Sequence, residues 1–238
     1  MALPKLNDVP LYKVTIPSNG RVVDFRPFLI KEQKVLLVAY ESQDQNQVIN
    51  AILQTIDACT NGAVETRKLT TIDVDYMFTQ IRAKSVGEGV TLNLKCDKCE
   101  GQTEVSINLE DIKPPQFSDK PMVVELTKDI KVKMKTPTYL DILTSNNFAK
   151  DTDSQMDLML KYLLTCMDSI QTEEENILLN DEPYEEKLSF LESLSTEQFG
   201  KLTQFLTTIP RIEHIIDVNC ESCGEKIHRV LEGVDNFF

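Results

Sequence analysis

Two CxxC pairs, separated by 120 residues, constrain this chain more than any other feature of its sequence. Cys96 and Cys99 lie in "LKCDKCEGQ", and Cys220 and Cys223 lie in "VNCESCGEK". Each pair stands between runs in which polar and apolar residues alternate, a pattern that predicts a β-hairpin with its thiols at the turn. The apolar residues before the two pairs also match in spacing. The sequence therefore predicts two similar hairpins whose thiols converge on one metal ion.

The predicted site is a closed structural zinc site in a zinc ribbon, in which each hairpin gives two thiolates to a tetrahedral ion. We expect Cys96, Cys99, Cys220 and Cys223 to be its ligands. The long separation does not prevent this, because each doubling of a loop costs only about 0.6 kcal/mol, whereas a structural zinc site contributes on the order of 10 kcal/mol in small peptides. Four nearby basic residues are expected to offset the excess negative charge of the thiolates: Lys95, Lys98, Lys226 and Arg229.

Three other interpretations of the thiols stay open at this point. A thioredoxin-type redox motif uses one CxxC at a strand-to-helix junction. A catalytic zinc site keeps an open position and usually includes histidine or a carboxylate, and His214 and His228 are expected to lie on strand faces of the second hairpin. Four cysteines can also hold iron or an iron–sulfur cluster. The remaining cysteines, Cys59 and Cys166, fall within apolar helical patterns and are predicted to be core residues.

Composition narrows the possible functions. The net charge of −13 argues against non-specific nucleic-acid binding, which needs Lys and Arg to neutralise phosphates. The longest apolar run, "VLLVAY", is too short to cross a bilayer, and "MALPKLNDVP" lacks the pattern of a secretion signal, so a cytosolic location is expected. The sequence contains no phosphate-binding glycine loop, nucleophile elbow or HExxH motif, and we therefore do not expect an enzyme.

The predicted fold is α+β, in three parts. An N-terminal β-hairpin and helices occupy residues 1–88, the discontinuous ribbon combines residues 89–112 with 211–238, and a hairpin-plus-helices insertion occupies residues 113–210. Asp73 and Asp75 point apart on a helix and are interpreted as first-turn acids, not as metal ligands.

Periodicity and turn signals locate the individual elements. Helices are expected at 28–42, 46–60, 70–87, 138–148, 155–168, 184–193 and 196–208. Outside the ribbon, hairpins are expected at 12–25 and 121–135, and the acidic stretch 169–181 is expected to form a short hairpin or loop.

Several segments resemble the T4-type bacteriophage baseplate hub assembly family. The most specific are "FRPFLIKEQKVLL" at 25–37 and "IRAKSVGE" at 81–88, and the N-terminal hairpin and both CxxC knuckles fit the same pattern. The resemblance covers most of the chain and is weakest from about 150 to 200.

The resemblance implies a phage-encoded protein needed to build the central hub of a contractile tail. Its partners would be hub proteins and the tape-measure protein, with no nucleic acid, membrane or small-molecule substrate. Such a protein acts in the host cytoplasm during assembly or stays in the tail baseplate of the virion, and the sequence leaves both open. The alternative function is that of a zinc-ribbon nucleic-acid-binding protein, such as a transcription or replication factor, against which the acidic balance counts.

Overall fold

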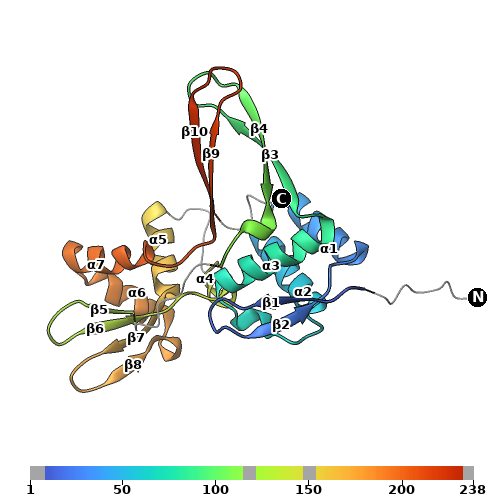
Figure 1. Cartoon of the computed structure of the whole chain (residues 1–238). Helices are drawn as coiled ribbons and strands as arrows, with labels where there is room; N and C mark the ends of the chain where they lie inside the picture. Colours follow the sequence, from blue (N-terminus) through green and yellow to red (C-terminus); the bar gives the residue numbers. More distant parts are fainter. Residues whose placement is uncertain (1–8, 115–121, 147–153, 233–238) are drawn as a thin grey trace, which may run out of the picture. The chain divides into compact units, whose positions relative to one another are not determined.

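The structure is a computed structural model that describes residues 9–114, 122–146 and 154–232, and it confirms a mixed α+β fold (Figure 1). Contacts divide the chain into two compact units. Unit 1 combines residues 1–117 with 211–238, and unit 2 comprises residues 118–210. The three-part division at residues 88, 112 and 210 stays a prediction.

Unit 1 contains three β-hairpins and a group of helices. Its elements are β1 (Tyr12–Thr15), β2 (Val22–Phe25), α1 (Ile30–Glu41), α2 (Gln45–Cys59), η1 (Thr66–Lys68), α3 (Thr71–Val86), β3 (Gly89–Lys95), β4 (Gln102–Asn108), η2 (Leu109–Asp111), β9 (Glu213–Asn219) and β10 (Lys226–Glu232). Each hairpin is a two-stranded antiparallel sheet, β1–β2, β3–β4 and β9–β10. Its core is formed by side chains of β1, β2 and the three α-helices, with Ile56, Val74, Met77, Phe78 and Ile81 fully buried.

Asp73 fixes the start of α3. Its side chain is fully buried, and one carboxylate oxygen accepts hydrogen bonds from the backbone N–H of Thr70 at 3.0 Å and the hydroxyl of Thr70 at 2.7 Å. The other oxygen accepts a hydrogen bond from the backbone N–H of Ser18 in the turn between β1 and β2, at 2.8 Å. This confirms the interpretation of Asp73 as a first-turn acid, and it shows that the same carboxylate ties the N-terminal hairpin to the helix.

Arg26 and Glu32 join β2 to both of the following helices. Their side chains form an ion pair of 2.9 Å, and the Glu32 carboxylate also accepts the backbone N–H of Leu29 at 2.8 Å. The backbone N–H of Arg26 donates to the carbonyl of Cys59, the last residue of α2, at 3.0 Å. The ion pair thus joins the end of β2 to the start of α1, and the backbone hydrogen bond of Arg26 joins the end of β2 to the end of α2.

The helix predicted from residue 28 begins at Ile30 instead, because the residues before it are held by a contact with α3. The backbone N–H of Phe28 donates to the hydroxyl of Ser85 near the end of α3, at 2.9 Å, and Leu29 has extended backbone angles. Because Phe28 lies in "FRPFLIKEQKVLL" and Ser85 in "IRAKSVGE", this bond joins the two most specific segments of the family resemblance.

Unit 2 is a four-stranded antiparallel sheet with helices. The sheet has the order β5-β6-β7-β8. The elements of the unit are β5 (Val123–Glu125), β6 (Lys131–Met134), α4 (Tyr139–Asn146), α5 (Gln155–Thr165), β7 (Met167–Gln171), β8 (Asn176–Leu178), η3 (Leu179–Asp181), α6 (Tyr184–Glu192) and α7 (Thr196–Leu206). The acidic stretch at 169–181 forms the β7–β8 hairpin, which was one of its two predicted forms. The predicted residues Pro121, Asn147 and Phe148 lie outside the described residues.

The helix predicted at 155–168 is wrong at its end. α5 stops at Thr165, Cys166 is its C-terminal cap, and Met167 begins β7. Residues from Met167 onward form a strand and not a helix because β7 pairs with both β6 and β8, with Ile170 opposite Val132 and Ile177. The pairing of β7 with β6 is distant in sequence, so helical periodicity does not reveal it.

Candidate metal centre

The two CxxC pairs lie in the turns of the β3–β4 and β9–β10 hairpins, and the two turns have the same backbone design. The N–H of Cys96 donates to the carbonyl of Gly101 at 2.9 Å, and that of Cys220 donates to the carbonyl of Glu225 at 2.7 Å. In each turn the residue after the second cysteine has left-handed backbone angles: φ is +57° at Glu100 and +71° at Gly224. Such a turn directs both thiols of a pair to the same side.

The four sulfur atoms converge in space. The Sγ atoms of Cys96 and Cys223 are 3.8 Å apart, those of Cys99 and Cys220 are 3.6 Å apart, and all four lie within 4.8 Å of one another. These separations are far longer than a disulfide bond of about 2.05 Å. They fit thiolates around one tetrahedral ion, because a Zn–S distance of about 2.3 Å places the sulfurs roughly 3.8 Å apart. The cluster therefore has the size of a four-thiolate metal site.

Backbone N–H groups favour the thiolate form of Cys220. The N–H groups of Cys223 and Ser222 lower the pKa of the Cys220 thiol to about 6. At Cys99 the N–H of Gly101 also lowers the pKa, but the neighbouring thiols of Cys223, Cys220 and Cys96 outweigh it and raise the pKa to about 12. Crowded thiols cannot all ionise without a cation between them, and a divalent metal ion removes that conflict.

Polar contacts cross between the two hairpins beside the sulfur cluster. Arg229 of β10 donates to the carboxylate of Asp97 in the first turn, at 2.6 Å, and to the carbonyl of Lys95 at 3.2 Å. Lys98 in the first turn forms an ion pair with Glu225 in the second. The N–H of Glu221 donates to the hydroxyl of Thr103 at 3.2 Å. The hairpins are thus joined by several polar contacts in addition to the sulfur cluster.

The two turns approach each other closely at Gly101. A Cβ atom at this position would lie 2.6 Å from the Oγ atom and 2.9 Å from the Cβ atom of Ser222, and 3.2 Å from the Sγ atom of Cys99. Such distances leave no room for any side chain. Gly101 is therefore needed for the contact between the turns, and its role differs from that of Gly224, which supplies a left-handed backbone.

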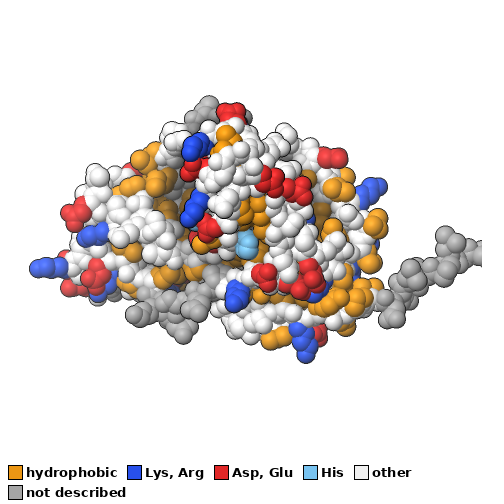
Figure 2. Space-filling model, turned by 45° about the horizontal axis from the view of Figure 1, so that its top comes forward, with side chains coloured by type: hydrophobic (Ala, Val, Ile, Leu, Met, Phe, Trp, Pro, Cys, Tyr) orange, Lys and Arg blue, Asp and Glu red, His pale blue; other side chains and the backbone are white. Residues whose placement is uncertain are grey.

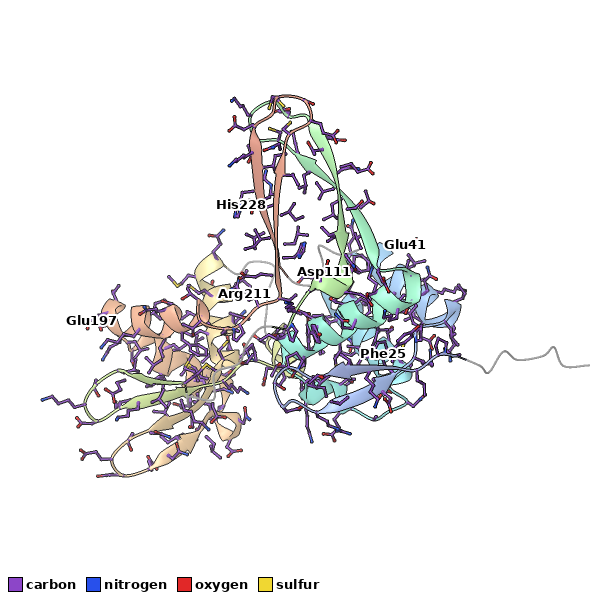
Figure 3. The ribbon with its side chains drawn as sticks, viewed as in Figure 1. Phe25, Glu41, Asp111, Glu197, Arg211 and His228 are labelled. Carbon is purple, nitrogen blue, oxygen red and sulfur yellow. The ribbon has the colours of Figure 1, made fainter. Side chains whose placement is uncertain are left out.

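Away from the turns, each hairpin buries an apolar face. The buried apolar residues are Val90, Leu94 and Ile107 in the first hairpin and Ile216, Ile227 and Leu231 in the second. A two-stranded sheet cannot bury a face by itself, so these faces need a covering layer. Figure 3 shows side chains of both hairpins extending into the space between their ribbons.

The structure brings the four predicted ligands together and leaves the histidines outside. In the part of the chain that is described, the candidate ligand group consists of Cys96, Cys99, Cys220 and Cys223. His228 lies on the exposed side of β10, where its Nδ1 atom is 2.8 Å from the carboxylate of Asp217 (Figure 3). Cys59 and Cys166 are fully buried, as predicted, and burial raises the pKa of each thiol to about 11.

The basic residues near the thiols were predicted to offset the negative charge of the thiolates, and the structure shows this only in part. The pKa of Lys98 is raised mainly by its bond to Glu225, and to a smaller extent by the thiols of Cys223 and Cys96. The pKa of Arg229 is likewise raised mainly by its bond to Asp97. Lys95 forms an ion pair with Glu100 at 3.4 Å. The cross-hairpin pairs were missed at the sequence level. The sequence signal for these pairs is that the two turns carry residues of opposite charge. The spacing of those residues does not predict which acidic residue pairs with which basic one.

Comparison with known proteins shows the class to which this chain belongs. Residues 9–238 match the family described as T4 bacteriophage base plate protein, and the chain belongs to that family. One relative is the baseplate hub assembly protein gp26 of Enterobacteria phage T4, which is 22% identical over 227 residues, covering 95% of this chain and 97% of that protein. No solved structure matches. The family resemblance recognised in the sequence is confirmed.

Proposed function

We propose that this chain is a baseplate hub assembly protein that acts by binding other baseplate proteins, without catalysing a reaction, and that Cys96, Cys99, Cys220 and Cys223 hold one structural zinc ion. The observation that carries the assembly role is the family match over residues 9–238, together with the name of the T4 relative. Its partners are hub proteins and the tape-measure protein. It acts in the host cytoplasm and in the tail baseplate under construction.

The sulfur geometry supports the zinc proposal. Four thiols within 4.8 Å of one another, with no histidine or carboxylate among them, match a closed structural site better than a catalytic one with an open position. A redox role is less well supported, because both CxxC pairs lie in hairpin turns and neither begins a helix. A zinc ribbon also explains how two short hairpins remain folded.

The charge distribution supports protein partners over nucleic acid. The chain carries 38 acidic and 25 basic residues. On the face drawn in Figure 2, Lys and Arg side chains are scattered among acidic ones and form no continuous basic patch. Phosphate binding needs such a patch. None of the described helices is long and apolar enough to cross a membrane.

The assembly role is tested by deleting the gene from the phage. Infected cells should then accumulate normal heads but no complete baseplates or tails, and supplying the intact gene should restore them. Electron microscopy of the lysates provides the measurement. Normal tails in the absence of the gene would refute the assembly role. Mass spectrometry of purified particles, compared with the lysate, shows whether the protein remains in the virion.

The close contact at Gly101 gives a prediction for the metal site itself. Gly101→Ala should lower zinc affinity by about ten- to a hundredfold, because the new methyl group pushes Ser222 and its turn away from the first hairpin. Competition with a chromophoric chelator measures the affinity. Gly89→Ala is the matched control, since a Cβ at residue 89 in the same hairpin meets nothing within 4 Å. Ser222→Gly should rescue Gly101→Ala. An unchanged affinity in Gly101→Ala would contradict the tight contact.

A further inference from the structure

Helix α1 is apolar well beyond the face that it buries. Its buried side contributes Leu36 and Ala39 to the core, with Glu32 beside them. On the outer side, Ile30, Leu37 and Val38 are 79%, 56% and 57% exposed. A helix with apolar residues on both sides is normally covered on both sides. The outer side of α1 is therefore a candidate binding surface.

Two opposite charges stand on this outer side, at the two ends of its central apolar pair. Lys34 and Glu41 are both exposed, and among the described residues neither forms an ion pair. They are seven residues apart, which on a helix places them on the same face but about 10 Å from each other, too far to pair. Leu37 and Val38 lie between them. The order is thus positive, apolar, apolar, negative.

This order of charged and apolar residues is complementary to the same order on a second α1 helix that runs in the opposite direction. In an antiparallel pair of α1 helices centred between Leu37 and Val38, each Lys34 faces the Glu41 of the other copy, and the apolar residues meet in the middle. A two-fold symmetric contact requires such self-complementarity, because the same patch serves both partners. We propose that the outer face of α1 binds a second copy of this chain through an antiparallel α1–α1 contact.

The surface beside α1 provides room for this arrangement. An open groove of about 410 Å³ runs between α1 and α2, and its lining includes Lys34 and Val38 from the proposed contact. The other lining residues are Val35, Ala39, Gln47, Asn50, Ala51 and Gln54, of which none is charged. In a chain of net charge −13, a groove without acidic residues allows a second copy to approach without repulsion there.

The contact is expected to be weak. One pair of 12-residue helices buries less surface than a standard interface, so a dissociation constant on the order of tens of micromolar is expected. Sedimentation velocity of the intact chain over a concentration series should show a monomer–dimer equilibrium. A monomer at every concentration would overturn the proposal.

Charge exchange tests the geometry specifically. Lys34→Glu and Glu41→Lys should each raise the dissociation constant about tenfold, because each places like charges opposite each other across the contact. The double variant Lys34→Glu/Glu41→Lys should dimerise as the parent does, since the exchange restores both pairs. Lys128→Glu is the control for Lys34→Glu, because it makes the same change of net charge. It lies in the exposed turn between β5 and β6 and should leave the dissociation constant of the dimer unchanged. Leu37→Asp should abolish the dimer.

Failure of the double variant to recover would also overturn the proposal, and would point to a different protein as the occupant of this face. Circular dichroism of each variant verifies folding, which these exposed positions should not disturb. The proposal does not depend on the assembly role, so a dimer can be confirmed or refuted without phage.

Discussion

Replacing Cys96 with serine should remove the zinc ion and lower the free energy of unfolding by more than about 4 kcal/mol, a loss in the range expected when a structural metal is removed. The Cys96 side chain is 1% exposed, and its Sγ atom lies 3.8 Å from that of Cys223 in the opposite hairpin. A serine hydroxyl at this position does not ionise near neutral pH and is a poor zinc ligand. Metal analysis and urea unfolding measure the two effects.

The effect is expected to be large because the metal joins segments that are far apart in the chain. Without it, the β3–β4 and β9–β10 hairpins retain their polar contacts, but most of these are exposed ion pairs such as Arg229 with Asp97. Each hairpin then depends on one small apolar face. Hydrogen exchange should therefore increase first in these strands, while the helices of unit 1 remain protected.

Cys166→Ala is the matched control. Cys166 is fully buried but lies in unit 2, so its replacement should cost some stability and leave the zinc content at one ion per chain. Thiol labelling adds a second measurement: in the native protein no cysteine should react, a chelator should release four, and a denaturant all six. Fresh protein that contains no metal would contradict the proposed site. Protein that contains iron would contradict zinc as the metal and would support the same four ligands.

The four thiols lie close together, as predicted from the sequence, and this was predictable because their signal is local. CxxC spacing between alternating runs predicts a hairpin turn, and the match between two such turns predicts that their thiols come together. The contacts that align the hairpins depend instead on which side chains meet after folding. Nothing in the spacing says that Lys98 faces Glu225, or that Gly101 meets Ser222. The end of α5 was missed for the same reason, since β7 is specified by its neighbours in the sheet.

The family signature was recognised in the sequence, but its physical role was not. "FRPFLIKE" contains Arg26, Phe28 and Glu32, and all three hold elements of unit 1 together. The contacts of these three residues therefore form a structural joint at the start of the segment, and they do not identify the surface that partners touch. This separation explains why a strong resemblance can predict the family without predicting a binding site.

The second large effect is expected at this joint. Glu32→Gln should lower the free energy of unfolding by about 3 kcal/mol at neutral pH, because it leaves the Arg26 guanidinium without its charged partner in a mostly buried site. The Arg26 and Glu32 side chains are 14% and 8% exposed. The glutamine can accept only one of the two hydrogen bonds from Arg26 and Leu29, so the loss reports the charge together with one hydrogen bond. Urea unfolding of the variant and the parent measures it.

The difference in the free energy of unfolding between Glu32→Gln and the parent should depend on pH. Burial acts to raise the pKa of Glu32, but the hydrogen bonds from Arg26 and from the backbone N–H of Leu29 outweigh it, so the pKa is lowered from 4.5. A carboxyl whose pKa is lower in the folded state stabilises the fold above its unfolded pKa. The stability difference should thus be complete at pH 7 and should shrink as the pH falls below about 4.5 and through the lowered pKa.

Lys31→Ala is the control for this prediction. Lys31 also contacts the Glu32 carboxylate, at 3.3 Å, but its side chain is 71% exposed, so its removal should cost only about 0.5 kcal/mol. The double variant Arg26→Met/Glu32→Gln should lose less stability than the sum of its single changes, because neither buried charge is then left alone. Equal losses in Lys31→Ala and Glu32→Gln would show that burial gives the Arg26–Glu32 pair no special importance.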